Sequence, residues 1–170
     1  MAVTIRPAQQ GDARAIATVH VASWQEGYAH IFDEAFLAEL DVDERAARYT
    51  LGLDAPDLPF TQLAEDGGVI VGFVTTSTAR DADLTGAGEI QALYVDPAHW
   101  RRGIGRQLLA SGTERLRAQG CTRGALWVLV ENMSAKELYM ANGWTADGSV
   151  RVEEPWGVVA TVERLVRPLD

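Results

Sequence analysis

The apolar and polar positions of the first third of the chain follow a helical period after a short alternating start. Residues 3–6 alternate between apolar and polar side chains, which predicts a short β-strand. Asp12 is then the expected N-cap of a helix. That helix runs through Ile16, Val19, His20 and Ser23. Two shorter helices are predicted, one at residues 34–40 and one that starts after Asp41 and includes Arg48.

The pattern changes to strands beyond Pro59. Residues 60–64 and 69–76 are rich in apolar and β-branched side chains, and Asp66-Gly67-Gly68 between them is typical of a tight hairpin turn. Further strands are expected at residues 89–95, 125–130, 144–152 and 158–165, and helices at residues 103–118 and 134–142. Without a repeat or a low-complexity linker, this order predicts one mixed α/β domain over residues 1–170.

Composition and charge narrow the classes of function. The 170 residues are 47% hydrophobic and carry a net charge of −9, which is typical of a soluble globular protein and unlike a nucleic-acid-binding one. Cys121 is the single cysteine, so no internal disulfide is expected. The N-terminus lacks the apolar region of a signal peptide, and no apolar run is long enough to span a bilayer. We therefore expect a cytoplasmic protein without a nucleic-acid or membrane partner.

The segment Trp100-Arg101-Arg102-Gly103-Ile104-Gly105-Arg106 has the composition of an anion-binding turn at the start of a helix. Unpaired backbone N–H groups at a helix N-terminus bind phosphate, and glycine lets the anion approach closely. The segment lacks the Gly-Lys-Ser/Thr of a Walker A loop and the third glycine of a dinucleotide-binding turn. The remaining pattern resembles the pyrophosphate motif Gln/Arg-x-x-Gly-x-Gly/Ala of the GNAT acetyltransferases, with Trp100 departing from its first position.

The neighbouring segments extend this resemblance to the GNAT family over about residues 88–144. Residues 89–97, Glu-Ile-Gln-Ala-Leu-Tyr-Val-Asp-Pro, look like the fourth strand of the family and the turn after it. The segment from Asn132 to Tyr139 and the following Asn142-Gly143-Trp144 are similar to its Asn-x-x-Ala-x-x-x-Tyr and Gly-Phe motifs. The start of the chain, Ile5-Arg6-Pro7-Ala8, also looks like GNAT proteins.

The resemblance implies a fold and a cosubstrate. The fold is a mixed, mostly antiparallel sheet of about six or seven strands flanked by helices, with splayed fourth and fifth strands. The cosubstrate is acetyl-CoA, no metal is expected, and homodimers are frequent in the family. The residues implied in coenzyme binding are Leu93, Tyr94, Val95, Arg101, Arg102, Gly103, Ile104, Gly105, Arg106, Asn132, Ala135 and Tyr139.

Glu89 is the candidate general base. Strand alternation is expected to set Glu89, Gln91, Leu93 and Val95 on one face, where a carboxylate on a central strand would be unusual. The resemblance agrees, because Glu89 precedes Gly103 by the offset of the general-base glutamate in histone-type GNAT enzymes. Direct proton transfer and transfer through a water both stay open. The alternative is that Glu89 lies exposed at the end of the sheet.

Tyr139 is the candidate acid that protonates the coenzyme sulfur, by its match to the family motif. Trp24, Tyr28, Gln91 and Trp127 are candidates for the acceptor pocket, although core packing explains each aromatic residue equally well. The resulting prediction is an N-acetyltransferase that acts on a small-molecule amine. Two alternatives stay open: an enzyme that acetylates protein N-termini or lysines, and a non-catalytic acetyl-CoA sensor.

Overall fold

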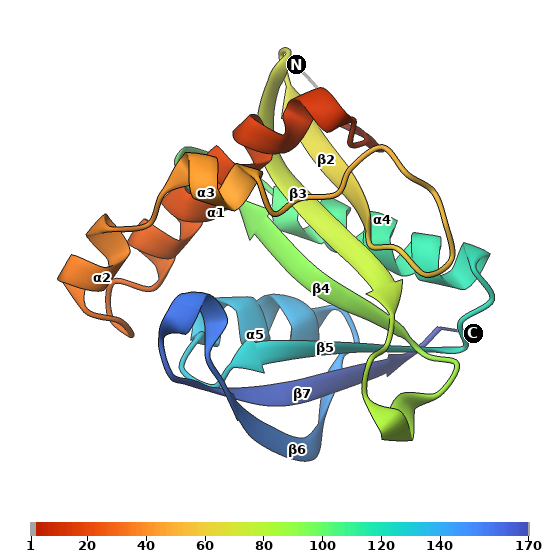
Figure 1. Cartoon of the computed structure of the whole chain (residues 1–170). Helices are drawn as coiled ribbons and strands as arrows, with labels where there is room; N and C mark the ends of the chain where they lie inside the picture. Colours follow the sequence, from red (N-terminus) through yellow and green to blue (C-terminus); the bar gives the residue numbers. More distant parts are fainter. Residues whose placement is uncertain (1–2, 170) are drawn as a thin grey trace.

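A seven-stranded sheet in the order β1-β2-β3-β4-β5-β7-β6 forms the centre of the computed structural model, which describes residues 3–169 (Figure 1). Neighbouring strands are antiparallel except β4 and β5, which are parallel. This arrangement confirms the predicted mixed, mostly antiparallel sheet. The strands are β1 (Thr4–Pro7), β2 (Phe60–Asp66), β3 (Val69–Thr78), β4 (Gly88–Val95), β5 (Arg123–Leu129), β6 (Thr145–Glu153) and β7 (Ala160–Pro168).

Helices cover both faces of the sheet. One face packs against α4 (Ile104–Ala118) and α5 (Met133–Ala141), whose side chains share a core cluster with β3, β4 and β5. The other face packs against α1 (Ala13–Gly27), which is followed by the short helices α2 (Glu34–Ala38) and α3 (Val42–Ala46). In Figure 1, α1, α2 and α3 lie together at the end of the sheet toward which β4 points.

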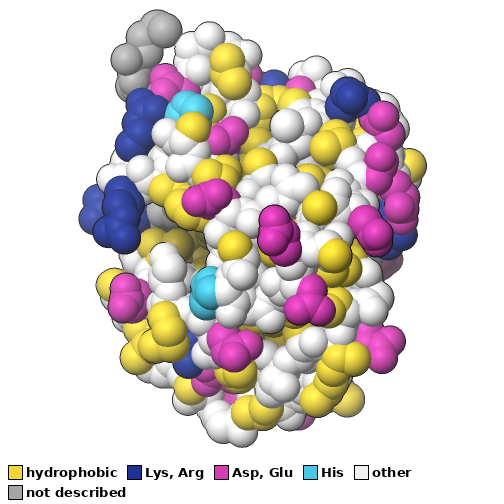
Figure 2. Space-filling view, turned by 90° about the vertical axis from the view of Figure 1, so that its left-hand side faces the viewer, with side chains coloured by type: hydrophobic (Ala, Val, Ile, Leu, Met, Phe, Trp, Pro, Cys, Tyr) yellow, Lys and Arg dark blue, Asp and Glu magenta, His cyan; other side chains and the backbone are white. Residues whose placement is uncertain are grey.

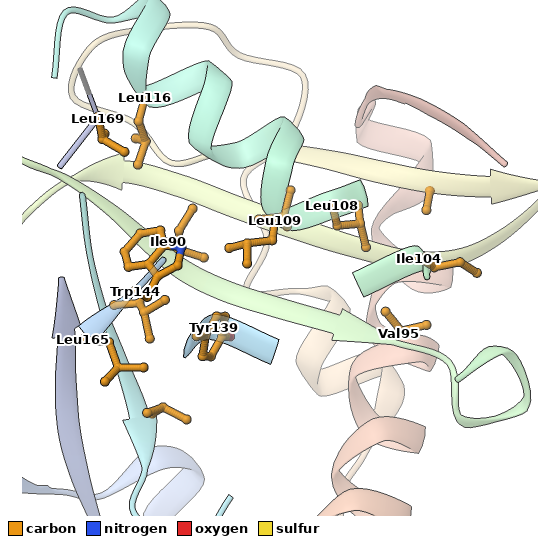
Figure 3. Close-up of a cluster of buried hydrophobic side chains, with 14 of the residues drawn as sticks. Ile90, Val95, Ile104, Leu108, Leu109, Leu116, Tyr139, Trp144, Leu165 and Leu169 are labelled. Carbon is orange, nitrogen blue, oxygen red and sulfur yellow. The ribbon is translucent and has the colours of Figure 1, made fainter. Parts of the chain in front are cut away.

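The apolar stripe of α4 builds the main core. Ile104, Leu108 and Leu116 are almost fully buried and share a cluster with Ile90 of β4 and Trp144 (Figure 3). Gly112 allows the close approach of helix and sheet, because a Cβ there would lie 3.0 Å from Val74 and 3.1 Å from Ile90. The single apolar face predicted from the sequence is therefore the contact between α4 and the sheet.

Asp12 does not cap α1 through its side chain, contrary to the sequence prediction. Its carboxylate accepts hydrogen bonds from the Gln9 backbone N–H at 2.8 Å and from the Arg6 guanidinium at 2.8 and 3.1 Å. Asp12 stands at the N-cap position of α1, but it is also the last residue of the single-turn 3-10 helix η1 (Gln10–Asp12) and has helical φ and ψ angles of −85° and −8°. Asp12 thus links β1 to the start of α1.

The third helix is shorter than predicted. Helix α3 ends at Ala46, so Arg48 lies beyond it. The Asp41 carboxylate accepts a hydrogen bond from the Glu44 backbone N–H at 2.7 Å and caps the helix. The predicted hairpin turn is confirmed, because Gly67 and Gly68 have φ angles of 61° and 86°, as a tight two-residue turn requires.

The surface agrees with the acidic composition. Figure 2 shows acidic side chains spread across one face, with Lys and Arg gathered near its sides. No helix among residues 3–169 combines the length and the apolar character needed to cross a lipid bilayer.

Candidate active site

Strands β4 and β5 diverge and open a cavity in the middle of the sheet. They pair along Gly88–Ile90 and Gly124–Leu126, after which β4 continues to Val95 and β5 to Leu129. The two arrows separate visibly in Figure 1, which confirms the expected splay. The cavity between them has a volume of about 1400 Å³ and reaches from the start of α4 to α1 and α3.

A β-bulge interrupts β4 at Gln91. Thr75 of β3 pairs with Ala92, whereas the next residue, Thr76, pairs with Ile90. Gln91 is therefore an extra residue in β4 without a partner of its own in this ladder. Such a bulge reverses the alternation of side chains on either side of it.

The bulge overturns the expected division of β4 between the two sheet faces. Ile90 shares the cluster against α4 with Leu93 and Val95, whereas Tyr94 packs in the clusters on the α1 side. Glu89 alternates with Ile90 and so faces the α1 side, with Tyr94. The prediction that Glu89 shares a face with Leu93 and Val95 is wrong.

Leu93 and Val95 direct backbone polar groups toward the cavity, where the Val95 C=O already accepts hydrogen bonds from Trp100 and Ser23. The Asp96 N–H donates to the Val71 C=O of β3 at 2.9 Å, so alternate residues of this part of β4 pair with β3. Leu93 and Val95 lie between those paired residues and point the opposite way, toward the open side. A ligand that carries amide groups can therefore pair with this edge as a further strand would.

The N-terminus of α4 forms a concave set of backbone donors. Arg101 and Gly103 have left-handed φ angles of 58° and 77°, and α4 begins immediately afterwards. The N–H groups of Ile104, Gly105 and Arg106 belong to the first turn and have no partner within the helix. Alternating left-handed and helical residues aim successive N–H groups at one point, which is the geometry of an anion nest.

The three arginines of this turn differ in their surroundings. Arg102 donates to the Asp66 carboxylate of the β2–β3 turn at 2.9 Å. Arg101 and Arg106 are exposed and line the cavity. Of the three, Arg101 and Arg106 are the better placed to add positive charge to the nest, and Arg102 holds the turn against β2.

Glu89 is buried although it lies near the start of β4. Its side chain is 5% exposed and accepts hydrogen bonds from the Arg80 guanidinium at 2.9 Å and 3.3 Å. The Arg80 backbone N–H also approaches the carboxylate at 3.4 Å. The alternative of an exposed Glu89 is therefore wrong. The β3–β4 loop instead covers it with a largely exposed arginine, which solvent screens.

Helix α5 brings Asn132, Ala135 and Tyr139 to the opposite wall of the cavity. The Asn132 carboxamide accepts a hydrogen bond from the Ala135 N–H at 3.2 Å and caps the helix. Burial raises the pKa of Tyr139 well above its ordinary value of 10, so its hydroxyl stays protonated. A Cβ on Gly105 would lie 3.3 Å from Leu138, so glycine lets the start of α4 approach α5 closely.

Aromatic side chains from three separate segments line the end of the cavity near α1 and α3, which we call the acceptor end. The ring centroids of Trp24 and Tyr28 lie 4.9 Å apart, which confirms that both occupy one face of α1. Trp156 stacks on Trp24 at 4.4 Å, and His20 stacks on Tyr94 of β4 at 4.3 Å. These rings are also buried in the protein core, so the two interpretations of the aromatic residues, acceptor pocket and core packing, apply to the same side chains.

Gln91 and Trp127 face the same cavity through polar contacts with neighbouring elements. The Gln91 carboxamide donates to the Ser77 hydroxyl at 2.7 Å. The Trp127 indole N–H donates to the Asp81 carboxylate at 2.9 Å, and the Arg151 guanidinium lies 3.8 Å above its ring. Both side chains are thus held in place before any ligand binds.

The sequence reasoning missed the conformation of Trp156. Its φ angle is 52° in the single-turn helix η4 (Pro155–Gly157), a region that a bulky side chain rarely occupies and that costs about 1–2 kcal/mol. The strain is offset by contacts of the indole with Trp24, His20 and Arg45. The Pro-Trp-Gly sequence indicates a turn but says nothing of what the indole contacts.

Cys121 is not among the residues that line the cavity. Cys121 is partly buried, and burial raises the pKa of its thiol, which disfavours the thiolate needed for nucleophilic attack. Among residues 3–169, no group of three or more His, Cys, Asp or Glu side chains has the arrangement of a metal site.

Comparison with known proteins identifies the family. The model of the acetyltransferase (GNAT) family matches residues 15–144, well over half of the chain. The chain belongs to the GNAT family. It is accordingly an acetyl-CoA-dependent acyltransferase, and the family suggested by the sequence motifs is confirmed.

Individual GNAT relatives differ in how much of their length this chain covers. The uncharacterized N-acetyltransferase YuaI of Bacillus subtilis is 32% identical over 133 residues, which are 78% of this chain and 75% of YuaI. A mycothiol acetyltransferase of Nocardioides is 28% identical over 160 residues, or 89% of this chain. The chain spans only about half of that relative, since the match covers 53% of it.

A solved structure shows the GNAT fold at low sequence identity. YncA of Salmonella typhimurium, described as a structure with its cofactor acetyl-CoA, superposes with a TM-score of 0.73. It is 24% identical, and the match covers 100% of this chain and 95% of YncA. The likeness therefore establishes the fold and leaves the acceptor open.

Trp100 departs from the GNAT pyrophosphate pattern and has a structural role here. Its indole N–H donates to the Val95 C=O at 2.7 Å, and the Ser23 hydroxyl donates to the same oxygen at 2.9 Å. A Cβ on Gly27 would lie 3.6 Å from the indole, so the ring packs against the end of α1. Trp100 thus holds the end of β4 against α1, and the backbone donors of the nest do not depend on its side chain.

Proposed function

We propose that this GNAT enzyme transfers the acetyl group of acetyl-CoA directly to the primary amine of a small molecule. One observation carries the proposal. Three kinds of group that the reaction requires line one cavity: a buried carboxylate at Glu89, a free strand N–H at Leu93 and a protonated phenol at Tyr139. The pair of Glu89 and Tyr139 favours an enzyme over a non-catalytic acetyl-CoA sensor, because a sensor needs neither a general base nor a general acid.

The coenzyme would bind along the part of the cavity between α4, β4 and α5. The nest from Arg101 to Arg106 would hold the pyrophosphate with backbone N–H groups. The open edge of β4 at residues 93–95, through the N–H and C=O groups of Leu93 and the N–H of Val95, would pair with the pantetheine amides. Asn132 and Ala135 would border the same arm from the opposite wall.

The proton transfers would fall to Glu89 and Tyr139. Glu89, directly or through a water, takes the proton of the acceptor ammonium, and the free amine then attacks the thioester carbonyl. The Leu93 N–H stabilises the oxyanion, a contribution of about 3 kcal/mol for such a donor in other enzymes. Tyr139 gives its proton to the departing thiolate, and the nitrogen, which still carries an extra proton after the attack, returns one to the Tyr139 phenolate. The products are a neutral amide and free coenzyme A, with the first proton on Glu89.

The acceptor end favours a small molecule over a protein chain. Trp24, Tyr28, Gln91 and Trp127 would contact the acceptor, and η4 covers them from the β6–β7 side. Trp156 of η4 packs on Trp24, which narrows the entrance for an extended peptide. The same aromatic walls can bury the apolar part of an amine.

A thiol-release screen tests the proposal. The purified protein is mixed with acetyl-CoA and a panel of primary amines, alongside peptides with free N-termini or lysines. Release of coenzyme A with a small amine supports the proposal, and release only with peptides contradicts it. Acetyl-CoA alone should raise the melting temperature, since a ligand at 100 times its Kd adds about 2.7 kcal/mol to the free energy of unfolding.

A further inference from the structure

The acceptor end contains an arginine without an acidic partner. Arg48, Arg80 and Arg151, which also line this end, are each paired with a carboxylate. Arg45 of α3 is partly buried, and among residues 3–169 no carboxylate oxygen lies within 4 Å of its guanidinium. A partly buried guanidinium without an anion is unusual, because a charge removed from water is normally compensated by a partner.

Neighbouring groups hold Arg45 by one edge of its guanidinium. Its Nε donates to Nδ1 of His20 at 3.2 Å, and the Tyr49 hydroxyl lies 2.6 Å from the same nitrogen. Since an arginine can only donate, His20 Nδ1 must carry a lone pair, and the neutral ring has its proton on Nε2. His20 is 3% exposed and therefore a fixed support for Arg45.

Aromatic rings fix the plane of the guanidinium. The carbon at its centre lies 4.6 Å from the Trp156 ring centroid and 5.6 Å from that of Tyr49. Trp156 is itself held in its left-handed conformation by its stacking on Trp24. The Tyr49 hydroxyl also lies close to the guanidinium, and no carboxylate or carbonyl oxygen of residues 3–169 accepts a hydrogen bond from Nη1 or Nη2.

Two of the acidic side chains that line this end are paired with arginines, and Glu26 of α1 is exposed to solvent. Glu89 accepts from Arg80, and Glu153 is paired with Arg151. Among the arginines that line this end in residues 3–169, Arg45 is therefore the one whose positive charge no paired carboxylate offsets, in a chain whose net charge is −9. This local charge would attract an anionic group on the acceptor and disfavour a second cationic one.

We propose that Arg45 binds a carboxylate of the acceptor, so that the amine substrate is an amino acid or a closely similar amino carboxylate. This inference rests on the proposed function and narrows its substrate class. The planar fork of Nη1 and Nη2 matches the two carboxylate oxygens, and Trp156 leaves this edge of the guanidinium free. His20 is a positioning residue, because it acts on the acceptor through Arg45.

The test compares amino acids with their amides, which differ only in the anionic group. Thiol release from acetyl-CoA is measured with the common amino acids other than proline, a secondary amine, and cysteine, whose own thiol would be detected. The corresponding amino acid amides and a set of dipeptides are measured alongside. We expect kcat/KM for the best amino acid to exceed that for its amide by on the order of 30-fold. Dipeptides, whose carboxylate lies farther from the amine, should resemble the amides.

Variants assign the preference to Arg45. Arg45→Gln should reduce the ratio between amino acid and amide to about threefold or less, mainly through a higher KM for the amino acid. Arg45→Lys should keep part of the preference, because it retains the charge without the fork. Arg48→Gln is the matched control, since Arg48 is exposed and paired with Glu44, and it should preserve the full ratio.

The outcomes separate this inference from the proposed function. Equal use of amino acids and amides by the unaltered enzyme, or an equal loss of both in Arg45→Gln, overturns the role of Arg45 while acetyl transfer stands. If no amine releases thiol, the proposed function fails. The binding of a carboxylate at Arg45 is then tested by the melting temperature of the protein with coenzyme A and either amino acids or their amides. Stabilisation by amino acids but not amides, lost in Arg45→Gln, supports the site, and no such difference overturns it.

Discussion

The end of the cavity around α4 and β4, where we propose that the coenzyme binds and which we call the coenzyme end, is built mainly from backbone groups. The acceptor end is built mainly from side chains. Around α4 and β4 the available donors are N–H groups of consecutive residues, exposed by left-handed turns and by the divergence of two strands. Around α1, α3 and η4 the walls are rings and guanidinium groups from segments far apart in the sequence. The backbone donors come from short continuous motifs, whereas the side-chain walls form only when distant segments fold together.

Because of this difference, the two ends should respond differently to substitution of their residues. A backbone nest tolerates substitution of its side chains, as Trp100 shows by serving the β4–α1 contact. An end built from side chains changes its ligand whenever one ring or charge is replaced. A family with one cosubstrate and many acceptors is the expected result of such a division.

The largest effect is expected at the boundary between the two ends, from Glu89→Gln. The amide cannot take a proton, so kcat/KM should fall by about 10³-fold, within the range of general-base catalysis. The measurement is steady-state thiol release with the best amine. Glu153→Gln, which removes another arginine-paired carboxylate of the cavity, should change kcat/KM by less than about threefold.

An equal loss in both of these variants would mean that the cavity needs negative charge and not a base at residue 89. That result would contradict the contrast between the two ends of the cavity, because the chemistry would no longer depend on one particular side chain.

Tyr139→Phe should lower kcat by about 10²-fold and leave the affinity for acetyl-CoA unchanged. Phenylalanine keeps the ring in the core cluster but cannot protonate the thiolate. Because burial raises the pKa of Tyr139 above 10, the unaltered enzyme should show no loss of rate from ionisation of this group up to pH 10. Unchanged turnover would remove Tyr139 from the mechanism.

Gly103→Ala tests whether the nest depends on backbone conformation. Gly103 has a φ of 77° and free space around a Cβ, so alanine adds backbone strain of about 1–2 kcal/mol without a clash. We expect the KM for acetyl-CoA to rise about tenfold as the turn relaxes. Gly68→Ala is the matched control, because Gly68 is equally left-handed, equally open and lies in the β2–β3 hairpin.

Gly68→Ala should therefore lower the melting temperature by a similar amount without affecting KM. A rise of KM in both variants would show that general destabilisation, and not the nest, sets coenzyme affinity.

The smallest effect concerns His20 at the acceptor end. Burial and the nearby Arg45 hold the pKa of His20 well below its ordinary value of 6.5. Below that pH the unfolded chain binds a proton that the folded chain excludes, so stability falls as pH decreases. Between pH 6.5 and 5.5 the loss should be about 1 kcal/mol in the free energy of unfolding, measured by urea denaturation.

His20→Gln should remove this slope, because glutamine keeps an acceptor for Arg45 and does not titrate. A slope that persists in the variant would assign the pH dependence to another group.

The elements of the fold could be predicted from the sequence because they depend on local periodicity. The hairpin turn at Gly67 and Gly68, the apolar stripe of α4 and the order of the strands follow from spacing alone. Errors arose where a tertiary contact overrode the local preference. Asp12 bonds to Arg6 of β1 in place of its own helix, and α3 stops before Arg48.

The candidate site divides in the same way. The glycines of the nest and the segment from Asn132 to Tyr139 were recognisable because each lies within one continuous motif. The face of Glu89 was predicted wrongly, because the bulge at Gln91 is a property of the β3–β4 ladder and leaves no mark on alternation. The role of Arg80 was equally invisible, since its partner Glu89 comes from the next strand.

The sequence by itself determined the family and, with it, the acetyl donor, and it predicted the backbone groups that we propose bind this donor. Those features rest on glycines and on periodic packing within short segments. Only the tertiary structure decided the acceptor end. His20, Arg45 and Trp156 come from two helices and a late turn, and their mutual contacts depend on how α1, α3 and η4 pack over β4. Packing of distant segments sets the charge and shape there, and neither quantity is encoded in local spacing.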